Sequence, residues 1–461
     1  MKNRVLIWNA HWETCGGGER YALELGKQIF ILGYEVSFAG PERKGLEKAM
    51  DTLGILNFEY DFIVIKHENE LLSIAQDYHA FINGSFGSAL VAPIPRSIYI
   101  CHFPTYSRRA RLGSKLFKNR HALTQVCNAS GVILNPPFNR VIWSNQSTII
   151  TLPESKNISI KVLEGEVLIS HFGNSSILKS SEFFTFDAPT TIWCEVPKES
   201  TSSYIVSNVD MHSWYRVFLS RFLPATGAHH SYKQVWANSM FTEKWISRWW
   251  GIDSIVVYPP VETKTQKSTS LLENKILSVG RFMSTKHHHS KNQLQLVRAL
   301  KRINRIQEKY SLTLIGGLSK SEEKYFRKVV KDSANHPVEI LPNATSSQLA
   351  DSITNATFYW HAAGLGQPSR KPQNFEHFGI APIEAMAAGL IPLVYEKGGP
   401  AEVLRDFPEL IYSNIRELVS KTKSLDPGQI SDLSQKMISL SHNYDTKVFA
   451  KRIEELLRLL D

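Results

Sequence analysis

The chain has 461 residues, more than one ordinary hydrophobic core accommodates, so its length predicts two main domains and leaves room for a small third. Its composition, 43% hydrophobic and 21% charged, is typical of a globular protein, and no apolar run reaches the ~18–20 residues that span a bilayer. The net charge of +10 excludes a generally acidic surface and favours an anionic partner: a membrane, a nucleic acid or a phosphorylated ligand.

Polar residues interrupt residues 1–14 too early for a signal peptide, so we expect a cytoplasmic location. None of the four cysteines forms a Cys-x-x-Cys pair, and in a reducing compartment they are expected to be buried free thiols: Cys15, Cys101, Cys127 and Cys194.

Short apolar segments alternate with amphipathic helical segments, a pattern of βαβ units around parallel sheets. A helix is predicted from Glu19 to about Leu32, after the glycine turn of residues 16–18. The first series of predicted strands is 4–9, 61–65, 80–83, 97–101 and 131–134, and the second is 275–280, 312–316, 339–341, 357–360 and 391–395. The fold class is therefore α/β, with two doubly wound, Rossmann-like domains separated by the linker 258–270.

One region departs from this alternation. Residues 135–208 show no helical period but contain five short segments rich in β-branched and aromatic residues: 158–162, 166–170, 182–186, 191–196 and 204–206. They predict a small antiparallel β module inserted into the first domain. It either binds an acceptor or partner, or is an insertion that a surface loop tolerates at little cost.

These patterns set the domain boundaries. Residues 1–134 and 209–257 form the first domain, 135–208 the inserted module and 271–442 the second domain. Residues 443–461 contain an amphipathic helix, with Phe449, Ile453, Leu456 and Leu460 on one face, which packs on a domain surface, the first domain being one candidate.

Two segments are candidates for membrane contact. Residues 106–121 combine six cations with apolar residues, and could rest on an anionic lipid surface or form a solvated basic helix face: Arg108, Arg109, Arg111, Leu112, Lys115, Leu116, Phe117, Lys118 and Arg120. The aromatic segment 213–223 is the second candidate, with simple core packing as its alternative.

Several residues suggest a phosphate site. Gly16, Gly17 and Gly18 follow the first strand, where a parallel sheet presents its ligand edge, but they match neither G-x-G-x-x-G nor the P-loop, and a structural turn would also explain them. Arg281 follows a strand of the second series and Lys291 precedes a helix. The two cations could neutralise a diphosphate or form exposed salt bridges.

Two glutamates, Glu376 and Glu384, flank the start of a predicted helix with seven residues between them. A carboxylate there can be a plain helix cap, because a helix N-terminus attracts anions. The alternative is a chemical role.

Four motifs in this order resemble the retaining GT-B glycosyltransferases of family four: "CGGGER" (15–20), "SVGRF" (278–282) with Lys291-Asn292, "WHAAGLG" (360–366) and "EHFGIAPIEAMAAGLIPLVYEKGGPAEVL" (376–404). The last block looks like that of bacterial polysaccharide enzymes and of the mannosyltransferases that extend lipid-linked oligosaccharides. The resemblance covers the first 30 residues, points such as 99–104 and 256–261, and most of 275–405, but not the β module.

The resemblance implies roles in the second domain. Glu384 would bind the ribose of a nucleotide sugar, Arg281 and Lys291 its diphosphate, and Glu376 the donor sugar. Lys286 is the alternative to Lys291, because residues 281–291 are spaced more widely than in the simplest family members. The backbone N–H groups around Phe378, Gly379 and Ile380 would face the diphosphate and sugar.

In the first domain the resemblance places His102 near the donor sugar and the reacting bond. Gly16, Gly17 and Gly18 would bind the donor, and Gly17 and Gly18 would let the domain close on the diphosphate. The implied reaction is transfer of a hexose, mannose or a related sugar, to a glycan or lipid-linked glycan in polysaccharide biosynthesis. Retention would come from same-face attack, with the leaving phosphate oxygen helping to deprotonate the acceptor. Glu376 as a transient nucleophile stays open.

No obligate metal and no other cofactor is expected, because the chain has no Asp-x-Asp and its cations can supply the charge of Mg²⁺. The run His287-His288-His289 is interpreted as a solvated loop, ahead of phosphate contact and zinc binding.

The expected partners are a nucleotide sugar, a glycan or lipid-linked acceptor and, as a hypothesis, an anionic membrane met from the cytoplasm; no nucleic-acid partner is expected. The alternatives are a GT-B nucleotide-sugar epimerase or phosphorylase and, outside the enzymes, a glycan-binding scaffold protein.

Overall fold

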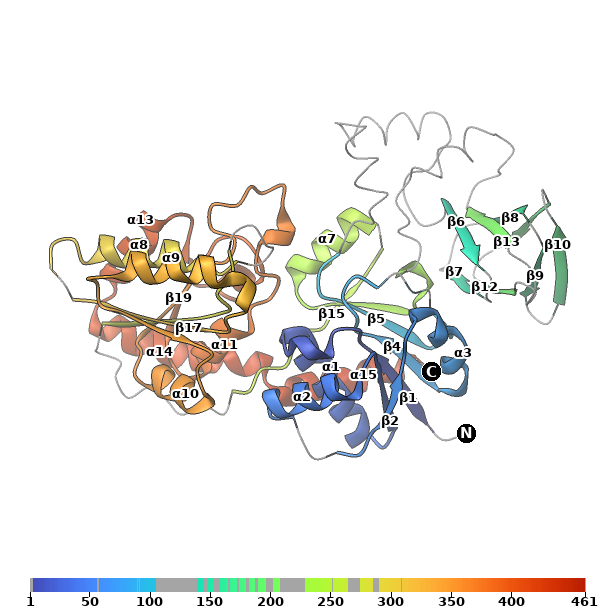
Figure 1. Cartoon of the computed structure of the whole chain (residues 1–461), viewed down its shortest axis with the longest axis horizontal. Helices are drawn as coiled ribbons and strands as arrows, with labels where there is room; N and C mark the ends of the chain where they lie inside the picture. Colours follow the sequence, from blue (N-terminus) through green and yellow to red (C-terminus); the bar gives the residue numbers. More distant parts are fainter. Residues whose placement is uncertain are drawn as a thin grey trace. The chain divides into compact units, whose positions relative to one another are not determined.

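The computed structural model describes residues 3–55, 58–88, 90, 92–104, 229–250, 252–263, 274–284, 290–307 and 309–460, together with the strands between 139 and 207 (Figure 1). Several predictions concern residues outside these ranges: the basic segment 106–121, the strand 131–134, the aromatic segment 213–223, and Lys286 with the adjacent histidine run.

The chain divides into two compact units. The first unit comprises Met1–Asn238, Thr242–Val257 and Ile453–Asp461, and the second comprises Ser239–Phe241 and Tyr258–Arg452. Each unit is built around its own parallel sheet.

The first unit has a seven-stranded parallel sheet in the order β15-β14-β5-β4-β1-β2-β3. Its strands are β1 (Arg4–Trp8), β2 (Glu35–Gly40), β3 (Asp61–Val64), β4 (Ala80–Asn83), β5 (Ser97–Cys101), β14 (Gln234–Ala237) and β15 (Ile255–Val256). Its helices are α1 (Gly17–Ile31), α2 (Arg43–Leu53), α3 (Leu71–Ile74) and most of α7 (Met240–Trp250). Strand order reverses between β1 and β4, and doubly wound sheets bind ligands at the carboxyl ends of strands at such a point.

The inserted module consists of two four-stranded antiparallel sheets, β10-β9-β12-β7 and β11-β8-β13-β6. The five predicted strands appear as β8 (Ile158–Glu164), β9 (Glu166–His171), β11 (Phe183–Phe186), β12 (Thr190–Glu195) and β13 (Ser202–Ser207). The sequence prediction missed β6 (Asn139–Ser144), β7 (Thr148–Leu152) and β10 (Asn174–Lys179). The Asn and Ser residues that begin or end β6 and β10 have low strand propensity, and their pairing with neighbouring strands overrides it.

The second unit has a six-stranded parallel sheet in the order β18-β17-β16-β19-β20-β21. Its strands are β16 (Lys275–Val279), β17 (Ser311–Gly316), β18 (Val338–Pro342), β19 (Phe358–His361), β20 (Ile391–Tyr395) and β21 (Ile411–Tyr412). Its helices are α8 (Gln293–Ile303), α9 (Glu323–Ser333), α10 (Ser346–Thr354), α11 (Ile380–Ala387), α12 (Gly399–Val403), α13 (Ile415–Ser424) and α14 (Pro427–Ser441). Strand order reverses here between β16 and β19, so the expected ligand edge lies where these two strands end.

The last helix, α15 (Thr446–Arg458), has the predicted apolar face: Phe449, Ile453, Leu456 and Leu460 are all buried. Its end belongs to the first unit, where the amide of Gln234 donates to the carbonyl of Leu456 at 3.3 Å. Among the residues described above, no helix is both long and apolar enough to cross a membrane. The α/β fold class with an antiparallel insertion is confirmed.

Candidate functional site

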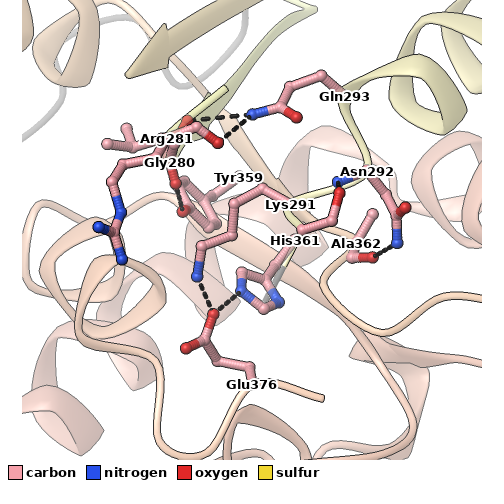
Figure 2. A network of polar contacts seen from close by, with 11 residues as sticks. Gly280, Arg281, Lys291, Asn292, Gln293, Tyr359, His361, Ala362 and Glu376 are labelled. Carbon is pink, nitrogen blue, oxygen red and sulfur yellow. Dashed lines mark hydrogen bonds and ion pairs between the residues drawn. The ribbon is translucent and has the colours of Figure 1, made fainter. Parts of the chain in front are cut away.

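A network of three polar side chains lies at the carboxyl ends of β16 and β19 in the second unit (Figure 2). The ammonium of Lys291 contacts the carboxylate of Glu376, and Nε2 of His361, the last residue of β19, lies 3.1 Å from Oε2 of the same carboxylate. Because an ionised carboxylate only accepts hydrogen bonds, His361 donates this one. The side chains of Lys291 and Glu376 are 22% and 16% exposed and that of His361 is 5% exposed, so a ligand can reach the first two.

The network fixes protonation states. Burial alone would raise the pKa of Glu376, but Lys291 and His361 outweigh this effect and hold the pKa well below its usual range. Burial lowers the pKa of His361, with Glu376 acting in the opposite direction. At neutral pH the site therefore holds an ionised carboxylate beside a neutral imidazole.

The backbone around Arg281 is held by Gln293, the first residue of α8. Its amide nitrogen donates to the carbonyls of Gly280 and Arg281, at 3.1 and 3.0 Å. Figure 2 shows the side chain of Lys291 reaching the Glu376 carboxylate. The exposed side chain of Arg281 extends in the same direction. Two cations thus lie near the end of β16, an arrangement that can neutralise a diphosphate.

Asn292 sets the position of Lys291. It has a left-handed backbone with φ of 55°, is 3% exposed, and occupies the N-cap position of α8 without capping the helix through its side chain. Its side-chain nitrogen donates to the carbonyls of Ala362 and Leu365, at 2.8 and 3.3 Å. The turn that carries Lys291 is therefore anchored to the loop that follows β19, the strand that ends at His361.

The start of α11 adds backbone N–H groups. Gly379 occupies the N-cap position with φ of 92° and, as a glycine, has no side chain that could accept from the first-turn N–H groups. The side chain of Phe378 is buried against Tyr258 and Tyr444, with ring centroids 5.5 and 5.6 Å away, so only its backbone can serve a ligand. Ile380 is the first residue of the helix.

The two glutamates of the predicted pair, Glu376 and Glu384, lie on either side of the start of α11. The carbonyl of Glu376 accepts a hydrogen bond from Gly399 N–H at 2.9 Å, which fixes the segment before α11. Glu384 lies inside α11, is partly exposed and contributes to the electrostatic field at Tyr359. The carboxylate that contacts Lys291 and His361 is that of Glu376.

In the first unit, the glycine turn and His102 come together. Gly16 caps α1, Gly17 and Gly18 begin it, and a Cβ atom on Gly18 would lie 3.1 Å from Nε2 of His102. The same Nε2 lies 3.3 Å from the carbonyl of Gly84, which follows β4. The imidazole therefore lies against the start of α1, near the ligand edge of this sheet.

Glu19 organises the turn, a role that the sequence analysis did not assign. It is 7% exposed, and one carboxylate oxygen accepts from Gly16 N–H at 2.8 Å and Thr14 Oγ1 at 2.5 Å. Burial lowers the pKa of His102, while the charge of Glu19 acts in the opposite direction. A glutamate three residues after a helix cap is the sequence signal for this arrangement.

His361 was also missed as a site residue, although it lies inside the "WHAAGLG" motif. A histidine at the end of a buried strand usually packs in a core, and only its contact with Glu376 distinguishes it. The structure thus brings together Arg281, Lys291 and Glu376 near the start of α11 in the second unit, and Gly16–Gly18 with His102 in the first.

Two doubly wound parallel sheets in separate units are the architecture of the GT-B glycosyltransferase fold. The glycosyltransferase of Rickettsia africae is similar to this chain with a TM-score of 0.57 and 12% identity, over 100% of this chain and 98% of that chain. The Anabaena protein Alr3699/HepE, solved in complex with UDP and glucose, is similar with a TM-score of 0.56 and 11% identity, over 99% of each chain. At such low identity these similarities show the fold alone.

Residues 261–456 match the family model of the glycosyl transferases group 1, and the resemblance seen in the motifs is confirmed. A GDP-Man:Man(3)GlcNAc(2)-PP-Dol alpha-1,2-mannosyltransferase of Dictyostelium discoideum is 28% identical over 228 residues, which is 44% of this chain and 41% of the relative. The chain thus spans less than half the length of this curated relative.

Proposed function

We propose that the protein is a retaining glycosyltransferase that moves a hexose from a nucleotide-diphosphate sugar to a glycan or lipid-linked glycan. The observation that carries the proposal is the Lys291–Glu376–His361 network at the reversal point of the second sheet, beside Arg281 and the uncapped start of α11. A glycan-binding scaffold has no use for such a group of cations around a carboxylate.

Each residue has a distinct task in this proposal. Arg281 and Lys291 bind the diphosphate and stabilise its charge as it leaves, and the N–H groups at Gly379 and Ile380 add the field of the helix start. Glu376, held ionised, faces the positive charge that develops on the donor sugar, and Glu384 binds the ribose hydroxyls.

His102 and Gly16–Gly18 are the contribution of the first unit. His102, neutral through burial, contacts the sugar near the reacting bond, while Gly17 and Gly18 let the backbone approach the diphosphate. The leaving phosphate oxygen takes the acceptor proton on the same face, which retains the configuration at the anomeric carbon.

The donor and acceptor are proposed from the relative's name. GDP-mannose is the first donor to test, and a lipid-linked oligosaccharide the first acceptor. We further propose that the reaction needs no metal ion, because Arg281, Lys291 and a helix start supply positive charge at one place. A lipid-linked acceptor would be met from the cytoplasm at an anionic membrane face.

A thermal-shift screen of GDP-mannose, GDP-glucose, UDP-glucose and UDP-N-acetylglucosamine tests the donor, because a ligand of the folded state stabilises it by about 2.7 kcal/mol at 100 times Kd. The shift should be lost in Arg281→Ala and kept in Arg305→Ala, which removes an exposed arginine just beyond the other end of α8. Shifts of equal size in both variants would contradict the proposed site.

Product analysis then separates the reactions. Transfer should require an acceptor, continue in a chelator, and keep the anomeric configuration of the donor. Conversion of the donor without an acceptor would indicate an epimerase, and release of a sugar phosphate with added phosphate would indicate a phosphorylase.

A further inference from the structure

A groove of about 480 Å³ lies between the N-terminal halves of α8 and α9. These two helices run side by side on one face of the second unit's sheet (Figure 1). The groove is lined by residues other than Arg281, Lys291, Glu376 and His361, so it is separate from the network described above.

The charges in the groove are predominantly positive. Arg298 of α8 faces it together with Lys324 and Lys328 of α9, and all three residues are exposed. None of them forms an ion pair with an acid in the part of the chain that the structure describes. Its one acidic lining residue, Glu322, is 8% exposed and accepts a hydrogen bond from Ser284 N–H at 2.9 Å, so this carboxylate already has a donor.

The three cations repel one another weakly in the absence of an anion. Lys324 and Lys328 are one helical turn apart on the same face of α9, and like charges at this spacing repel one another. Arg298 adds a third positive charge from the opposite wall. A bound anion would offset these repulsions by attracting all three cations.

A larger hollow of about 730 Å³ near the starts of β16, β17 and β18 offers no such selectivity. It is lined by Lys275 but also by Glu339 and Asp351, so its charges are mixed. Of these two hollows, the groove between α8 and α9 is the one whose charge selects a ligand class.

We propose that this groove binds the phosphate group of a phosphate ester. Lysine ammonium groups act as point charges toward phosphate, and an arginine fork can hold two of its oxygens. The groove has room for an organic group beside the phosphate, and Leu294 and Tyr325 provide an apolar wall for it. The ester is either a soluble molecule or the headgroup of a membrane phospholipid.

The groove is connected to the backbone of Arg281. Tyr325 lines the groove, and its hydroxyl donates to the side-chain oxygen of Gln293 at 3.0 Å. The nitrogen of the same amide donates to the carbonyls of Gly280 and Arg281. The groove therefore lies beside the candidate donor site but uses different cations, and its occupancy does not depend on the proposed reaction.

Calorimetric titration with inorganic phosphate and with glycerol 3-phosphate, at low salt, tests the inference. It is made in an Arg281→Ala/Lys291→Ala background, so that phosphate bound by those two cations does not contribute. Adding Lys324→Ala and Lys328→Ala should weaken binding at least about tenfold, because each removes a charged contact. Adding Lys320→Ala and Lys331→Ala instead, which removes two cations outside the groove lining, should change it less than about twofold.

Flotation of the full chain with phosphatidylcholine vesicles, with and without phosphatidylglycerol, shows whether the phosphate ester is a soluble molecule or a lipid headgroup. Recruitment that needs phosphatidylglycerol, Lys324 and Lys328 makes the ligand a lipid headgroup, whereas glycerol 3-phosphate binding without recruitment makes it a soluble ester. Phosphate binding that is unchanged by the groove substitutions, or weakened equally by the control pair, would overturn the inference, as would absence of both phosphate and vesicle binding. These outcomes are independent of any nucleotide-sugar result.

Discussion

Gly280 lies directly against the side chain of Lys291: a Cβ atom at position 280 would be 2.5 Å from Lys291 Cγ. No real Cβ contact is that short, so the path of the lysine toward Glu376 depends on the missing side chain at residue 280. The same residue is held by backbone hydrogen bonding, from Gly280 N–H to the carbonyl of Ile315 at 2.8 Å. The backbone therefore cannot easily move away, and the lysine would have to.

Gly280→Ala should displace Lys291 and break its contact with Glu376. We expect a destabilisation of about 1–3 kcal/mol from overpacking, and a larger loss of nucleotide-sugar affinity than of stability. Urea denaturation and titration with the donor measure the two effects. Gly317→Ala is the matched control, because a Cβ there meets Arg281 Cγ at 3.6 Å, an ordinary contact. Equal donor affinity in both variants would show that Lys291 does not bind the donor.

Glu376→Gln keeps the shape of the side chain but removes the charge that Lys291 and His361 hold. If this carboxylate stabilises the developing charge on the sugar, kcat should fall by about 10²–10³-fold, while donor affinity changes less than about tenfold. Steady-state kinetics with saturating acceptor separate the two quantities. The control is Glu339→Gln, an exposed glutamate of β18, which should leave kcat unchanged. A kcat within about twofold of the original in Glu376→Gln would rule out this role.

Much of the fold could be predicted because strands and helices have different apolar periods. The buried strands β16, β19 and β20 appear in the sequence as short apolar runs, and the structure contains each within one residue of the predicted start. The two-residue strand β21 was not predicted, since so short a segment has no measurable period. In the inserted module, β6 and β10 begin with asparagine and contain serine, residues of low strand propensity, so their sequence signal was too weak.

The site was predictable where it consists of charged residues at element ends, and not where a contact depends on packing. Arg281, Lys291 and Glu376 were identified from their places beside strands and helices. The contact of His361 with Glu376 and the anchoring of Asn292 to Ala362 each join segments distant in sequence, so no local pattern contains them. Glu19 is the intermediate case, because its capping pattern is local.

The free energy of unfolding should depend on pH through the titration of the buried His361. The folded pKa of His361 is lowered, so the unfolded chain binds a proton first, near pH 6.5, and stability is lost as the pH falls. Between pH 7 and 5 the native protein should lose up to about 1.4 kcal/mol per pH unit more than His361→Gln, whose amide cannot titrate.

Glu376 affects the stability of the fold only at a lower pH than His361 does. Its folded pKa is also lowered, so its contribution is constant above about pH 4.3 and decreases only as the pH falls further. Urea denaturation at half-unit pH intervals measures both windows. Parallel pH profiles for the native protein and His361→Gln between pH 7 and 5 would contradict the assignment of a neutral, buried imidazole.

Asn292 combines two contributions that substitutions can separate. Asn292→Gly keeps a backbone that accepts φ of 55° but removes the hydrogen bonds to Ala362 and Leu365, at a cost of about 1–3 kcal/mol. Asn292→Ala loses the same hydrogen bonds and adds left-handed strain, so it should be about 1 kcal/mol less stable than the glycine variant. The urea midpoints of unfolding of the two variants measure this difference. An alanine variant as stable as the glycine variant would contradict the predicted strain.

Gly18→Ala should reduce activity without destabilising the protein, because the two effects of the methyl group act on different parts of the first unit. Alanine is favoured over glycine in the first turn of α1 by up to about 1 kcal/mol, whereas the new Cβ lies 3.1 Å from Nε2 of His102 and must shift the imidazole by a few tenths of an ångström. If His102 contacts the reacting sugar, kcat/KM should fall about tenfold, since small misplacements of a catalytic group are costly.

Gly45→Ala provides the comparison for that variant. Gly45 lies in α2, and a Cβ there meets its nearest atom at 3.4 Å, so alanine should stabilise this helix similarly without reaching His102. Thermal denaturation and kinetics on both variants then separate helix propensity from the effect on the histidine. Unchanged kcat/KM in Gly18→Ala would mean that the glycines form a structural turn, and that the orientation of His102 does not limit the reaction.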